Sequence, residues 1–312
     1  GPLLAAVMRW CFAYHDPSPN SAEWTLPRGF AAALRAEGVE LWTVPFADPA
    51  QAQLPSCEAF AERGIAVLLV FYAGRSPALE RELLRLRLGT DLLIVNELGD
   101  EPQTRPLNAQ RVQLSDLCLS PDAASTEHWR ALGARCAWFT HWADTALFHP
   151  EEPPGAQRPL FVVTTMGRRR YHRWLRVLLG RRYQNRRCSG EQNTHFYASG
   201  AVAFQYARWG EVTRRVFEAA ACGCCVLTNA LPPATRLGEL LPPDQAAVYY
   251  RGGWSLLRQL WRLARQPQWL RRVAAEGQRR VLAEHTQLVR ARQLLALVSA
   301  LPVSQRRPGF SA

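Results

Sequence analysis

The sequence contains no lysine, and all 38 of its basic residues are arginines. This absence excludes a lysine Schiff base and the lysine of a P-loop. No run of apolar residues approaches the roughly 20 needed to span a bilayer. No Gly-x-Gly-x-x-Gly follows a predicted strand, which disfavours a plain dinucleotide-binding oxidoreductase.

The cysteines are few, and their placement indicates free thiols. Cys222, Cys224 and Cys225 crowd one predicted junction between a helix and a strand, and the others are scattered. Buried free thiols in a reducing compartment explain this pattern better than disulfides or zinc. The apolar N-terminus lacks a basic region and a small-residue cleavage site. We therefore expect a cytoplasmic protein.

Charge is divided unequally along the chain. Residues 1–150 hold 12 arginines against 17 acids, a balance of −5, whereas residues 151–312 hold 26 arginines against 9 acids, a balance of +17. A solvated surface explains most of this excess. Arginine also suits bidentate phosphate contacts, and an anionic membrane surface or nucleic acid would be attracted to such a half.

The length of 312 residues suits two domains of about 150 residues each. In the first, residues 1–150, predicted strands alternate with amphipathic helices, as in a doubly wound parallel sheet. The strands are predicted at 5–14, 39–44, 65–71, 91–95, 116–119 and 136–139. A polar linker rich in Pro and Gly follows at 151–159, then a second such domain at 160–285. Residues 286–312 are predicted to form a C-terminal helix that crosses back to the first domain, followed by a tail.

The segment 210–229, GEVTRRVFEAAACGCCVLTN, carries the main functional signal. It predicts a helix over 211–222, a glycine stop at Gly223 and a buried strand over 224–228. A helix N-terminus attracts anions such as phosphate. Gly210 permits close approach of a ligand, and Thr213 and Arg214 add donors. Glu218, predicted on the same helix face as Glu211 and Arg214, is placed to accept two sugar hydroxyls.

These residues resemble the donor-binding helix of the group 1 nucleotide-sugar glycosyltransferases, which have the GT-B fold. The run from Glu218 to Gly223 matches the second half of their motif, and its variant is most similar to the spore-maturation-type (CgeB-like) branch. Residues 142–150, WADTALFHP, resemble the class signature before the linker. In one departure, the first glutamate of the motif stands at Glu211, and Gly210 occupies the position eight before Glu218.

The resemblance implies a GT-B glycosyltransferase of two Rossmann-like domains, with its active site in the cleft between them. Its donor is a nucleotide diphosphate sugar, most readily a UDP-sugar, and no cofactor is implied. Reaction without a metal and with retained anomeric configuration is expected, because arginines replace the ion and no Asp-x-Asp motif is present. The implied donor-binding residues are Gly167, Arg168, Arg173, Gly210, Glu211, Thr213, Arg214 and Glu218.

Polar residues after the first-domain strands mark the acceptor side, because ligands bind at the carboxyl ends of parallel strands. His15 and Asp16 follow the first strand, and His141 follows the last. Glu97 and Asp100 lie in the acidic loop after the fourth, where one of them is a candidate base. Glu211 is the third candidate catalytic residue.

Two other functions remain open for the same fold. One is a DNA-base glycosyltransferase, which the +17 half favours and the acidic acceptor half opposes. The other is a catalytically silent nucleotide-binding module, suggested by the shifted Glu211. Trp254, Trp261 and Trp269 are interpreted as packing between helices. The acceptor stays open: a glycan, a protein and a small molecule are candidates ahead of DNA. Peripheral membrane contact through the basic half is also open.

Overall fold

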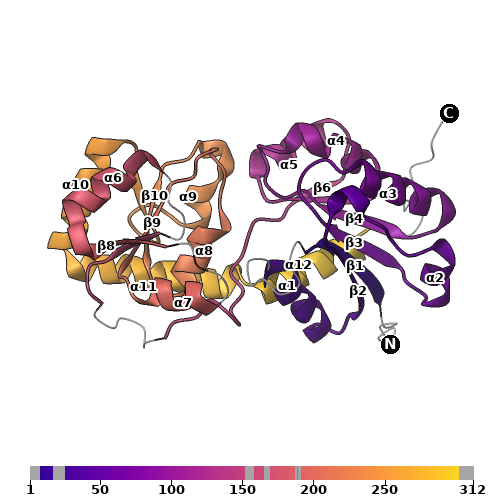
Figure 1. Ribbon diagram of the computed structural model, residues 1–312, viewed down its shortest axis with the longest axis horizontal. Helices are drawn as coiled ribbons and strands as arrows, with labels where there is room; N and C mark the ends of the chain where they lie inside the picture. Colours follow the sequence, from indigo (N-terminus) through magenta and orange to yellow (C-terminus); the bar gives the residue numbers. More distant parts are fainter. Residues whose placement is uncertain are drawn as a thin grey trace. The chain divides into compact units, whose positions relative to one another are not determined.

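The computed structural model describes residues 8–16, 25–151, 158–164, 169–186, 188 and 191–301. It divides the chain into two compact units, residues 1–140 with 290–312 and residues 141–289. Each unit is built around one sheet, and every strand pairing in the described residues is parallel (Figure 1). The prediction of two doubly wound parallel sheets is confirmed.

The first unit contains a six-stranded sheet in the order β2-β1-β3-β4-β5-β6. Its strands are β1 (Arg9–His15), β2 (Glu40–Phe46), β3 (Val67–Phe71), β4 (Leu93–Glu97), β5 (Leu117–Ser120) and β6 (Cys136–Trp138). The helices of this unit are α1 (Thr25–Ala36), α2 (Cys57–Glu62), α3 (Pro77–Gly89), α4 (Arg105–Gln113), α5 (Ala123–Ala131) and, from Arg290 onward, α12 (Gln287–Ser299). The strand order reverses between β1 and β3, and a ligand crevice forms at such a reversal.

The second unit contains a five-stranded sheet in the order β11-β10-β9-β7-β8. Its strands are β7 (Val162–Thr164), β8 (Tyr183–Asn185), β9 (Val202–Gln205), β10 (Cys225–Asn229) and β11 (Val248–Tyr250). Its helices are α6 (Arg169–Leu179), α7 (Glu191–Ala198), α8 (Arg214–Ala221), α9 (Leu237–Leu240), α10 (Gly253–Arg265) and α11 (Pro267–Glu284). Here the order reverses between β7 and β9, so the segments that follow these two strands border the crevice.

The structure differs from the sequence-based expectations in three places. β8 was not predicted, because a three-residue strand with two polar residues has no hydrophobic pattern. The helix predicted from residue 211 begins only at Arg214, because Thr213 keeps an extended backbone (φ −91°, ψ 148°) as its N-cap. Trp254 and Trp261 are exposed, since α10 buries its opposite face through Leu256, Leu260 and Leu263, whereas Trp269 is buried as predicted.

Other expectations agree with the structure. The helix α8 ends at Ala221, and Gly223, which follows the C-cap Cys222, has a left-handed backbone (φ +82°) that glycine adopts readily. All eight cysteines are free thiols, and six of them are buried. Among the described residues, no helix is long and apolar enough to cross a membrane.

Candidate functional site

The loop between β9 and α8 is held by polar residues at the ends of two neighbouring strands. Asn229, at the end of β10, accepts a hydrogen bond from the backbone N–H of Ala207 (2.7 Å) and donates one to its carbonyl (3.2 Å). Gln205, at the end of β9, donates to the Thr213 hydroxyl (3.1 Å). The sequence placed Gln205 at the start of the loop over the donor, but it did not predict Asn229 as a site residue. The rule that ligands bind at strand ends would have found Asn229 as well.

Gly210 and Glu211 lie in this loop, before the first turn of α8. Gly210 has a φ of +74°, in the left-handed region that other residues adopt only with strain. The Glu211 carboxylate turns back to accept a hydrogen bond from the backbone N–H of Trp209 (2.8 Å). The prediction that Glu211 shares a helix face with Glu218 is therefore wrong, because the helix begins three residues later. A contact between Glu211 and the donor stays a prediction.

Glu218 and Arg214 face each other one helical turn apart, as predicted. Arg214 Nε lies 3.3 Å from Glu218 Oε1, and the Glu218 residue is only 9% exposed. Burial raises the pKa of the Glu218 carboxyl, Arg214 and Arg215 oppose this shift, and Asp144 adds to it. The first turns of α8 thus combine a carboxylate that can accept hydrogen bonds from hydroxyl groups with a guanidinium that can bind phosphate oxygens.

A pocket of about 290 Å³ lies at the same edge of the sheet, in the segments that follow β10 and β11. Its lining includes Pro232, Tyr249, Arg251, Arg258 and Gln259. A side-chain Cβ at Gly210 would lie 3.9 Å from Cδ of Pro232, so the β9–α8 loop borders the pocket wall. Small-molecule sites have volumes of about 300–1,000 Å³, so this pocket is at the lower end of that range.

The remaining donor-site predictions cannot be placed around this loop. Gly167 and Arg168 lie outside the described residues. Arg173 is exposed on α6, the helix that follows β7. Its contact with a diphosphate therefore stays a prediction.

His15 and Asp16 end β1 beside the strand reversal of the first unit. His15 stacks on Phe46 (5.9 Å between centroids) and meets Tyr72 edge-on (5.7 Å). Asp16 is 4% exposed and pairs with Arg28 of α1 at 2.7 Å. The ion pair connects α1 to the end of β1, so Asp16 has a structural role. Its contact with an acceptor stays a prediction.

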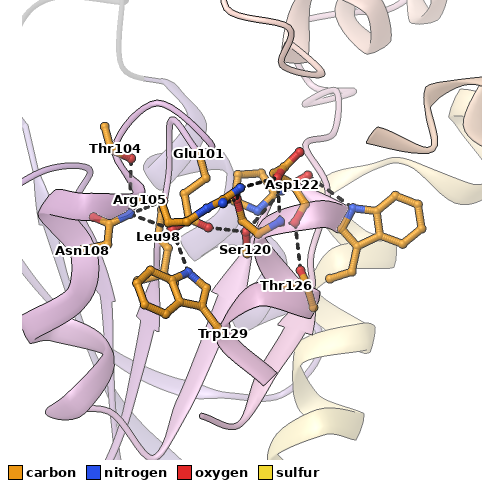
Figure 2. A network of polar contacts seen from close by, with 12 residues as sticks. Leu98, Glu101, Thr104, Arg105, Asn108, Ser120, Asp122, Thr126 and Trp129 are labelled. Carbon is orange, nitrogen blue, oxygen red and sulfur yellow. Dashed lines mark hydrogen bonds and ion pairs between the residues drawn. The ribbon is translucent and has the colours of Figure 1, made fainter. Parts of the chain in front are cut away.

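The acidic loop after β4 divides into a structural acid and a candidate functional one. Figure 2 shows Glu101 at the centre of a buried network. It accepts hydrogen bonds from the Ser120 hydroxyl (2.5 Å), Trp129 Nε1 (2.9 Å) and Asn108 Nδ2 (3.1 Å). With three donors its carboxylate is well satisfied, and it anchors the loop that carries Glu97 to the helices α4 and α5.

Glu97 is the other acid, and its protonation is strongly perturbed. Burial raises the pKa of the Glu97 carboxyl to about 8, Asp100 and Glu101 add to the shift, and Gly99 and Arg111 oppose it. Arg111 is itself fully buried and lies 5.2 Å from the Tyr72 ring. A carboxyl that titrates near neutral pH suits general acid or base catalysis. Asp100 is exposed and has a left-handed backbone (φ +58°).

Known proteins resemble this chain in sequence over residues 152–296 and in fold over most of its length. Residues 152–296 match the family model described as glycosyl transferase-like. The chain has the GT-B fold, and residues 152–296 are similar to glycosyl transferases. No curated protein sequence matches it.

Solved structures share the fold of this chain over most of its length. Sucrose-phosphate synthase from Thermosynechococcus elongatus is 14% identical, with a TM-score of 0.66 over 93% of this chain and 98% of that one. HepE from Anabaena, in complex with UDP and glucose, is 14% identical, with a TM-score of 0.63 over 94% and 100%. An alpha-glucosyltransferase in complex with UDP and a 13-mer DNA is 8% identical, with a TM-score of 0.64 over 94% and 100%.

Two further points complete the candidate site. His141, predicted on the acceptor side, is half-buried and is the first residue of the second unit. Within the described ranges, no three His, Cys, Asp or Glu side chains are grouped as a metal site requires. The structure thus brings Gly210, Thr213, Arg214 and Glu218 to one edge of the second sheet.

Proposed function

We propose that this protein is a glycosyltransferase that moves a sugar from a nucleoside diphosphate sugar, with a UDP-sugar as the first candidate, to an acceptor. The Arg214–Glu218 pair carries the proposal. It combines a cation that can bind phosphate with a buried carboxylate that can accept hydrogen bonds from hydroxyl groups, beside the reversal of strand order between β7 and β9. UDP is the first candidate because it is bound in HepE and in the alpha-glucosyltransferase. We also propose membership of the spore-maturation-type branch.

In this proposal the second unit binds the donor. Glu218 accepts hydrogen bonds from the two ribose hydroxyls. Arg214, Arg168 and the N-terminus of α8 bind the diphosphate. Their positive charge stabilises the negative charge that develops on the leaving diphosphate, often the largest catalytic contribution. The proposed reaction needs no divalent ion and retains the anomeric configuration. The first unit binds the acceptor, and Glu97 exchanges a proton with its hydroxyl.

A binding screen tests the donor assignment. UDP, GDP, CDP and TDP are compared by thermal shift and calorimetry, with and without magnesium. A ligand that binds only the native state raises the melting temperature by mass action. We expect a selective shift with UDP that does not depend on magnesium. No shift with any of the four nucleotides would contradict the proposal.

DNA is a second candidate acceptor. It is favoured by the structural similarity to an alpha-glucosyltransferase that binds DNA and by the +17 balance of residues 151–312. The −5 balance of residues 1–150 opposes it. Retention on duplex DNA that falls steeply with salt would support this acceptor. A silent module would instead bind UDP without releasing it from any UDP-sugar.

A further inference from the structure

The outer faces of α6 and α10 carry an unusual concentration of exposed apolar side chains. Trp174, Val177 and Leu178 of α6 are 53%, 79% and 55% exposed, and Trp254 and Trp261 of α10 are 87% and 63% exposed. We call these five side chains the tryptophan face. Exposed apolar residues that occur singly need no explanation, but a contiguous group marks an interaction site.

The helices α6 and α10 lie side by side (Figure 1), and each carries part of this group of exposed side chains. A Cβ placed on Gly253, the first residue of α10, would lie 3.0 Å from Cζ3 of Trp174. The Trp174 ring therefore packs directly against the start of α10, next to Trp254. Trp261 follows two turns later on the same face. The inner faces of both helices belong to one hydrophobic core, which fixes the orientation of the outer faces.

The two helices of the tryptophan face are basic. α6 and α10 contain seven arginines and no Asp or Glu, and one of these arginines, Arg262, is paired with Asp244. Arg176, Arg181, Arg182 and Arg265 are exposed around the apolar side chains. The Arg265 guanidinium lies 6.0 Å from the centre of the Trp261 ring.

We propose that the tryptophan face docks the protein on an anionic lipid bilayer. Indole rings prefer the boundary between headgroups and acyl chains, and arginines bind the lipid phosphates. The aliphatic side chains of Val177 and Leu178 favour acyl chains and have no use on a nucleic acid. A second copy of the chain is a poor partner, because a two-fold contact would place like charges opposite each other.

Vesicle flotation of the full chain tests this docking. One set of vesicles contains phosphatidylcholine alone, and the other also contains phosphatidylglycerol. We expect flotation with the anionic vesicles only, weakened by salt, and a blue shift of tryptophan fluorescence. Trp254→Ala with Trp261→Ala should reduce the partition coefficient at least about tenfold. Replacing Arg176, Arg181 and Arg182 with glutamine should reduce it by a similar factor.

The matched control is Leu88→Ala with Leu132→Ala, since these side chains are 70% and 67% exposed in the first unit. It should float as the wild type does. The melting temperature of the tryptophan variant should equal that of the wild type, because both indoles are exposed. Equal flotation of the tryptophan variant and the wild type would overturn the proposal, as would flotation that ignores lipid charge. Retention on DNA without vesicle binding, or a dimer lost in the tryptophan variant, would assign the face to another partner.

Discussion

Replacing Glu218 with glutamine tests the donor site at its most specific contact. The substitution keeps the size of the side chain, but it removes a buried negative charge 3.3 Å from Arg214. The two ribose hydroxyls then meet one neutral acceptor oxygen and one amide donor. We expect Glu218→Gln to weaken UDP binding without unfolding the second unit.

The magnitude follows from the kind of hydrogen bond that is lost. Hydrogen bonds to a charged group contribute about 1.5–3 kcal/mol and neutral ones about 0.5–1.5 kcal/mol. Two weakened bonds therefore cost about 2 kcal/mol, or roughly 30-fold in Kd. Stability should hold, because burial raises the pKa of Glu218 and so makes its charged form the costlier one in the native state. Arg214 loses its partner, but its side chain is 35% exposed and can be solvated.

Calorimetry with UDP and thermal unfolding without ligand measure the two effects separately. Glu127→Gln is the control, since it breaks an i,i+3 ion pair of 2.8 Å to Arg130 on the first unit. The control should bind UDP as the wild type does. Wild-type affinity in Glu218→Gln would refute the assignment of this carboxylate to the ribose. A large fall in melting temperature would instead show that Glu218 is structural.

Three further predictions address the loops around the two sheets. Burial raises the pKa of Glu97 to about 8, so its contribution to stability is complete below about pH 4.5 and is lost as pH rises to about 8. Melting curves against pH should show this decline in the wild type and lose it in Glu97→Gln, whereas parallel curves would contradict the shift. Asn229→Ala removes both hydrogen bonds to Ala207 and should lower the free energy of unfolding by about 1–3 kcal/mol, measured in urea, together with UDP affinity. Trp129→Phe removes a hydrogen-bond donor to Glu101 and should lower the free energy of unfolding by about 1–3 kcal/mol. UDP affinity should stay unchanged, and a weaker UDP affinity would contradict the assignment of donor binding to the second unit.

Local patterns in the sequence were enough for most of the fold. Alternating apolar runs and amphipathic segments predicted all six strands of the first sheet, because a buried parallel strand and a helix face each leave a periodic signal. The helix α8 and its glycine stop were predicted in the same way. β8 has too few apolar residues to leave such a signal.

The partners of individual side chains depended on the tertiary structure. The sequence alone determined that Arg214 and Glu218 would meet, because helical geometry relates residues four apart. It did not determine that Asn229 holds the β9–α8 loop, or that Glu97 at the end of β4 and Glu101 in the loop that follows have different environments. Those properties come from contacts between segments distant in sequence, such as Ser120 and Trp129 with Glu101. The exposure of Trp254 and Trp261 was likewise decided by the face of α10 that packs on the sheet.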